Sequence, residues 1–211
     1  DCINFIVDES SHSNEIELLI RGNPNVDLVK LNHELFCKIS DLNSSTGLMA
    51  LIEIPLENST LQTKGFHLIL NDIQDPGNVG SILRSHAALG NDFVFLSKGC
   101  CDLWSPKTIR GSQGVQFFLR CFEDQDIRKL IENFNFPTYC LSMKGKSLFS
   151  HKFQQDIAMI LGNEGHGIDV GLSQKAHETL AIPMVSDIES LNVSAAASIV
   201  MYEYARQLQL T

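Results

Sequence analysis

Short runs of consecutive apolar residues recur along the last two-thirds of this 211-residue chain, with helical segments between them. Strands that are apolar without alternation are typical of a sheet that helices cover on both faces. The sequence therefore predicts an α/β fold with a mostly parallel sheet covered by helices on both faces. The expected strands are Phe66–Asn71, Asp92–Leu96, Val115–Cys121, Pro137–Leu141, Ile157–Leu161 and Leu180–Met184.

The amino-terminal part predicts a second, smaller α/β unit. Short apolar runs alternate there with amphipathic stretches, and turn-forming residues separate them. These segments are Asn4–Val7, Glu15–Ile20, Val26–Leu31, Glu34–Ile39 and Leu48–Ile54. The polar stretch Glu57–Lys64 is the best candidate linker, so we expect domains over residues 1–58 and 65–211.

Composition excludes some classes of protein. No run of roughly 18 apolar residues is present, so a membrane span is not expected. The amino terminus lacks a basic leader and a long apolar stretch, which predicts a cytoplasmic protein. Six scattered cysteines without CxxC spacing or a histidine cluster predict free thiols in a reducing cytosol and no metal site.

The net charge of −9 argues at first against a nucleic-acid partner. The distribution of charge weakens this argument, because most of the negative charge lies in residues 1–60, which hold 3 basic and 10 acidic side chains. Residues 61–211 hold 13 and 15, which is close to neutral. Local patches in the larger domain are therefore compatible with RNA binding.

The first candidate binding segment follows the strand at Phe66–Asn71. Asp75-Pro76-Gly77-Asn78 predicts a sharp turn, with Asn78 as the N-cap of a helix over 79–89 and Arg84 on that helix. A helix amino terminus near a guanidinium favours a phosphate or sugar–phosphate group. The alternative is that Asn78 is only a cap and Arg84 only a surface charge. The turn is neither GxGxxG nor a Walker sequence, so a dinucleotide or P-loop site is disfavoured.

Two later segments also end predicted strands in polar or glycine-rich sequence. Gly162-Asn163-Glu164-Gly165-His166-Gly167 requires a sharp bend or close backbone approach to a ligand. The second segment, Ser190-Leu191-Asn192, enters a final helix predicted over 193–209, with Ser190 or Asn192 as its N-cap. Small residues at the start of that helix leave room for an adenine-like ring.

With these three segments in order, the chain closely resembles the SpoU-like (TrmH-type) RNA ribose 2′-O-methyltransferases of the SPOUT superfamily over roughly 65–208. The resemblance implies a sheet with a carboxy-terminal trefoil knot and a homodimer. It also implies transfer of a methyl group from S-adenosylmethionine to a ribose 2′-hydroxyl of rRNA or tRNA.

The resemblance also assigns site residues and implies no metal and no membrane partner. The catalytic set is Asn78, Arg84, Glu164, Ser190 and Asn192. The cofactor-binding positions are Gly162, Asn163, Ile182, Met184 and Leu191. Relatives often carry a small RNA-recognition domain upstream, and residues 1–58 correspond to a shorter, acidic version.

Two other functions remain compatible with the sequence. One is an RNA-binding or assembly module of the same fold without transfer activity. The other is a SPOUT enzyme that methylates a base. The RNA and the nucleotide that are modified cannot be read from the sequence, because RNA is recognised largely through shape and unstacked loops.

Overall fold

The computed structural model describes residues 2–40, 46–55, 64–185 and 190–209. The chain divides into two compact units, Asp1–Leu56 and Glu57–Thr211. Apart from Lys64, the linker expected at 57–64 lies outside the described residues. Among the described residues, no helix has the length and apolar character needed to cross a bilayer.

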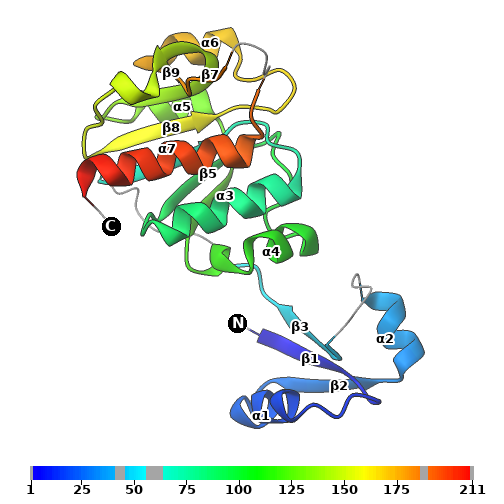
Figure 1. The fold of residues 1–211 in the computed structure, drawn as a ribbon. Helices are drawn as coiled ribbons and strands as arrows, with labels where there is room; N and C mark the ends of the chain where they lie inside the picture. The colour runs from blue at the N-terminus through cyan, green and yellow to red at the C-terminus, as the bar shows by residue number, and fades with distance from the viewer. Residues whose placement is uncertain (1, 41–45, 56–63, 186–189, 210–211) are drawn as a thin grey trace. The chain divides into compact units, whose positions relative to one another are not determined.

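The amino-terminal unit is a three-stranded sheet with two helices (Figure 1). Its central strand β1 pairs parallel with β2 and antiparallel with β3. Phe5, Ile16 and Phe36 are buried and form its small core. The elements are β1 (Cys2–Asp8), α1 (Asn14–Gly22), β2 (Asp27–Leu31), α2 (His33–Ile39) and β3 (Leu48–Ile52).

The larger unit is built on a six-stranded sheet in the order β6-β5-β4-β8-β7-β9, and every strand pairing in it is parallel. The central strands β4 and β8 are buried along their whole length. The strands are β4 (Phe66–Leu70), β5 (Phe93–Ser97), β6 (Arg120–Gln125), β7 (Thr138–Ser147), β8 (Ile157–Leu161) and β9 (Glu178–Ala181).

Helices cover both faces of this sheet (Figure 1). On one face, Leu83 of α3 and Val200 of α7 pack with Leu68 of β4. On the other face, Ile131 of α5 and Leu172 of α6 pack with the sheet. The predicted α/β architecture is therefore confirmed. The helices are α3 (Pro76–Ala88), α4 (Pro106–Ser112), α5 (Ile127–Glu132), α6 (Val170–Lys175) and α7 (Val193–Leu208), with short 3₁₀ turns η1 (Val115–Phe117) and η2 (Leu148–Ser150).

The strand predicted over Val115–Cys121 is wrong in its first half. Gln113 and Gly114 both have positive φ, 56° and 77°, which turns the chain into η1 instead. Gln116 points inward, where its side-chain amide donates to the carbonyl of Leu103. The strand begins only at Arg120. Consecutive apolar residues therefore cannot distinguish a strand from a turn whose side chains are partly buried.

The crossing of α3 and α4 depends on a glycine in the first of these helices. A Cβ on Gly80 would lie 2.6 Å from the carbonyl carbon of Gly111 and from the amide nitrogen of Ser112. Both are backbone atoms, so neither can rotate away. The two helices can approach this closely only with glycine at position 80.

Gly80→Ala is expected to lower the free energy of unfolding by about 2 kcal/mol, because overpacking against backbone forces the helices apart. The matched control is Gly111→Ala, whose Cβ would lie 3.4 Å from the nearest atoms, an ordinary contact. That variant should stay close to wild type in urea-induced unfolding. If Gly80→Ala lowered the free energy of unfolding no more than Gly111→Ala does, the two helices would be able to move apart at little cost.

Candidate active site

The start of α3 differs from the sequence expectation. Asp75, not Asn78, is the N-cap, and its carboxylate accepts a hydrogen bond from the backbone N–H of Asn78 at 2.7 Å. Pro76 occupies the first helical turn, where its missing N–H costs nothing. The prediction that Asn78 caps this helix was therefore wrong, and the Asn78 side chain is available for other contacts.

Asn78 joins the three segments that the sequence singled out. Its Nδ2 donates to Glu164 Oε1 at 3.0 Å, and its Oδ1 accepts from Asn192 Nδ2 at 2.9 Å. An amide is suited to this position because it donates on one side and accepts on the other. Glu164, Asn78 and Asn192 thus form one hydrogen-bonded chain, which we call the Asn78 bridge.

Asn192 also begins the last helix. Its Oδ1 accepts from the backbone N–H groups of Ser194 and Ala195, so it is the N-cap of α7. Of the two caps the sequence allowed, the structure selects Asn192. Ser190 is exposed and makes no polar contact with another described residue.

Arg84 lies on α3, six residues after Asn78 along the same helix, and it is exposed. Within the described part of the chain, its guanidinium makes no hydrogen bond or ion pair. Two other arginines of this unit differ: Arg128 donates to Asp169 at 2.6 Å, and Arg206 pairs with Glu203 at 2.7 Å. The donors of Arg84 are therefore not used within the described part of the chain.

The loop after β8 folds back on itself. The backbone N–H of Gly167 donates to the carbonyl of Asn163 at 2.9 Å, and a Cβ on Gly162 would lie 2.6 Å from the Gly167 carbonyl carbon. Gly162 is thus required by the loop's own path. The Asn163 side chain is also used internally, since its Oδ1 accepts from the N–H groups of Gly165 and His166.

Two residues that the sequence reasoning missed, Asp72 and His166, tie the first segment to the second. Asp72 has a positive φ of 63°, and its carboxylate lies 3.0 Å from His166 Nε2. Its backbone carbonyl accepts from Asn163 Nδ2 at 2.7 Å. No local sequence pattern predicts this contact, because the two residues come from different loops.

The remaining predicted cofactor positions follow β9. Ile182 and Met184 are half-buried, and Leu191 is 37% exposed directly before the α7 cap. Because β8 and β9 both run parallel to β7, their carboxyl ends lie at the same edge of the sheet, where ligands bind in α/β folds. Across the described ranges, no group of three or more His, Cys, Asp or Glu side chains is placed to hold a metal ion.

The larger unit is similar to a known protein family. The profile of the SpoU rRNA Methylase family matches residues 65–202, which is more than half of the chain. The chain belongs to the SpoU rRNA methylase family. The matched region contains Asn78, Arg84, Glu164, Ser190 and Asn192, so all five predicted catalytic residues lie inside the SpoU unit.

Named relatives of this SpoU family member include "rRNA methyltransferase 3A, mitochondrial" of Danio rerio, 30% identical over 86% of this chain and 54% of that protein. "23S rRNA (guanosine(2553)-2′-O)-methyltransferase RlmP" of Bacillus subtilis is 30% identical over 82% of this chain and 70% of that protein. The chain thus spans only about half the length of the zebrafish relative.

A solved structure shows the same fold over nearly the whole chain. The SpoU methyltransferase AviRb from Streptomyces viridochromogenes, in complex with AdoMet, has a TM-score of 0.89 and 21% identity, covering 99% of this chain and 84% of that one. The fold similarity therefore includes the amino-terminal unit as well as the SpoU unit.

The Asn78 bridge can be tested by reversing one hydrogen bond. Asn78→Asp is expected to lower the free energy of unfolding at pH 7 by about 1 kcal/mol, because an aspartate cannot donate to Glu164. Adding Glu164→Gln should recover most of this loss, since the new amide donates to the new carboxylate. Urea unfolding of both single variants and the double variant measures this coupling. Strictly additive losses would show that the bridge contributes nothing.

Proposed function

We propose that this chain transfers the methyl group of S-adenosylmethionine to a ribose 2′-hydroxyl of ribosomal or transfer RNA. The observation that carries the proposal is the Asn78 bridge, which joins Glu164 and Asn192 to Asn78. Asn78 lies on α3, the helix that also holds Arg84. The name of the Bacillus relative, which specifies 2′-O-methylation of 23S rRNA, supports this chemistry.

The residues of the site would act mainly by positioning. Methyl transfer is an in-line displacement, so the ribose oxygen must be held on the line through the methyl carbon. Arg84 would bind a phosphate or the ribose, because guanidinium donors match such oxygens. The Asn78 bridge would hold α3 against the start of α7 while the RNA binds. Ser190 would contact the RNA backbone.

The proton of the ribose hydroxyl needs an acceptor during attack. We propose that Arg84 accepts this proton when a bound RNA phosphate alters the electronic state of its guanidinium. Arginine is otherwise a poor base, because its pKa exceeds about 12. The alternative is that Arg84 only orients the ribose and that water accepts the proton.

The residues that we assign to the cofactor fit a nucleoside with an apolar flank. S-adenosylmethionine would supply an activated methyl group. Leu191 presents an exposed apolar side chain before α7, and Ile182 and Met184 lie after β9. Gly162 and Asn163 would contribute backbone groups, since the side chain of Asn163 is already bonded within its loop. The trefoil knot implied by the resemblance remains a prediction.

We further propose a homodimer in the cytoplasm. A shallow, mostly apolar depression on the α3 and α7 surface is lined by Ala88, Leu89, Phe149, Ile199 and Tyr202 together with Ser85, Ser198 and Glu203. Phe149 and Tyr202 are 69% and 61% exposed, more than a large aromatic side chain favours in a monomer. All six cysteines are free, which agrees with a reducing compartment.

We assign substrate recognition to the amino-terminal unit. Its acidic side chains argue against broad phosphate binding, so recognition would depend on shape and unstacked bases. Removing this unit should therefore lower the selectivity among RNA substrates more than it lowers the affinity for S-adenosylmethionine.

The deciding experiment combines the protein with methyl-labelled S-adenosylmethionine and total RNA. Label in RNA whose modified linkage resists alkaline cleavage supports ribose methylation. Label at an alkali-sensitive linkage would indicate base methylation, and RNA binding without label would indicate an assembly module. Nucleotide-resolution mapping in cells with and without the gene would then identify the target.

A further inference from the structure

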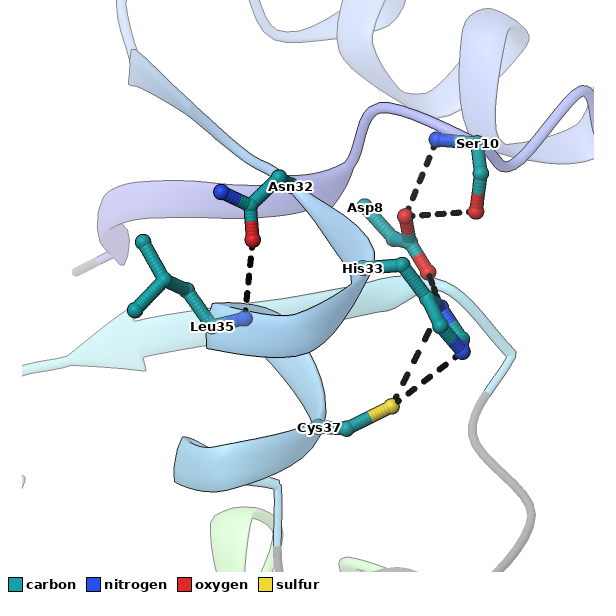
Figure 2. Close-up of polar contacts among 6 residues, drawn as sticks. All are labelled: Asp8, Ser10, Asn32, His33, Leu35 and Cys37. Atoms are coloured by element: carbon teal, nitrogen blue, oxygen red, sulfur yellow. Dashed lines mark hydrogen bonds and ion pairs between the residues drawn. The ribbon is translucent and has the colours of Figure 1, made fainter.

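The amino-terminal unit contains a cluster of three side chains that methyl transfer does not use. His33 and Cys37 lie four residues apart on α2, and Asp8 ends β1 (Figure 2). Residues at this spacing face the same side of a helix. Asp8 Oδ2 lies 2.7 Å from His33 Nδ1, and Cys37 Sγ lies 3.6 Å from His33 Nε2 and 3.9 Å from Nδ1.

Asp8 orients the imidazole and sets its tautomer. It is only 5% exposed, and its carboxylate accepts hydrogen bonds from the backbone N–H and the hydroxyl of Ser10. The hydrogen bond with His33 and those from Ser10 lower the pKa of Asp8 to about 2. An ionised carboxylate can only accept, so we assign the proton between them to His33 Nδ1. The neutral ring then has its basic nitrogen, Nε2, available to the Cys37 thiol.

Cys37 is the cysteine most open to reagents. It is exposed, whereas the other five are half-buried or buried. Burial raises the pKa of the Cys100 and Cys101 thiols, and it raises that of Cys140 to about 12. The thiolate is the reactive form, so these three are poor nucleophiles. The chain therefore contains its own set of unreactive comparison thiols.

The cluster is not needed to build its helix. The side chain of Asn32 already caps α2 by accepting from the backbone N–H of Leu35 at 2.9 Å (Figure 2). Phe36, which is fully buried, anchors the helix to the unit. The side chain of His33 is 70% exposed, so it adds little packing. Nearby charges on α2 are also paired, since Lys38 donates to Glu34 at 2.6 Å.

We propose that Cys37 is a site of reversible thiol modification that forms mixed disulfides with small-molecule disulfides, with His33 as its base and Asp8 as the residue that orients His33. His33 Nε2 takes the thiol proton, and the Cys37 thiolate attacks one sulfur of the disulfide. A new S–S bond forms as the old one breaks, and the departing thiolate takes up a proton from His33. One disulfide is consumed and one is formed, so the exchange needs no other oxidant. This site acts independently of the proposed methyl transfer.

The test exposes the full chain to limiting oxidised glutathione at pH 7 with a chelator present, and maps adducts by peptide mass spectrometry. Cys37 should carry the first adduct, ahead of Cys2 and the four cysteines of the larger unit. His33→Gln should slow that adduct by about tenfold, because an ordinary thiol is only a few per cent ionised at this pH. His12→Gln, an exposed histidine of the same unit, should leave the rate unchanged.

A pH profile separates this role from simple exposure. The ratio of the wild-type rate to the His33→Gln rate should fall as the pH rises above 7, because a thiol then ionises without the help of a base. Circular dichroism would show that His33→Gln keeps the fold, as expected for an exposed side chain. An unchanged rate in His33→Gln would overturn the proposal. So would modification that occurs with the chelator but not in a matched sample without it, because His33 and Cys37 would then be ligands of a metal ion.

Discussion

Replacing Arg84 by alanine is expected to lower the rate of RNA methylation by about a thousandfold, because the variant loses the guanidinium that we propose to hold the reacting sugar–phosphate. The side chain is exposed, and it has no hydrogen bond or ion pair to another described residue. The fold should therefore be unaffected by the substitution. Binding of S-adenosylmethionine, measured by calorimetry, should stay near wild type. A single-turnover assay with labelled cofactor measures the loss.

The control for this prediction is Arg128→Ala. Arg128 is also an exposed arginine on a helix of the larger unit, but it lies on α5, on the other face of the sheet, and pairs with Asp169. Its loss should leave the rate of transfer within about threefold of wild type, because surface ion pairs contribute little. If Arg84→Ala retained full turnover, Arg84 would have no central role, and both accounts of proton removal would fail.

The stability of the larger unit is expected to fall in mildly acidic solution because of His86. This side chain of α3 is fully buried, and its ring lies 5.9 Å from that of Phe66. Burial lowers its pKa from 6.5 to about 3. In the unfolded chain His86 takes up a proton below pH 6.5, whereas the folded chain does so only near pH 3. The free energy of unfolding should therefore fall by about 1.4 kcal/mol for each pH unit between roughly 6 and 4 through this one group.

His86→Leu isolates this contribution. Leucine has no titratable group, so the variant should lose the slope due to His86 while keeping that of every other side chain. The difference between wild type and variant should be constant above pH 6.5 and should shift by about 3 kcal/mol in favour of the variant by pH 4. Chemical unfolding at a series of pH values measures it. Parallel curves down to pH 4 would show that His86 is protonated in the folded protein.

The sequence predicted much of the architecture because strand and helix signals are local. Ile157–Leu161 is a strand with the predicted bounds, and the last helix begins at Val193 as expected. The local sequence is also compatible with the observed cap of α3, because Asp75 directly before Pro76 fits an N-cap followed by a proline in the first turn. Asn78 is a residue type that suits an N-cap equally well, so the local sequence does not decide between the two.

The sequence by itself determined the α/β class, the residue types of the site and the order of the segments that hold them. The tertiary structure decided which side chains meet. Glu164 and Asn192 lie 86 and 114 residues from Asn78, and only the parallel sheet brings the three together. The same holds for Asp72 and His166, which are 94 residues apart. Hydrogen bonds depend on distance in space, and a one-dimensional pattern specifies that distance only within a turn or a helix.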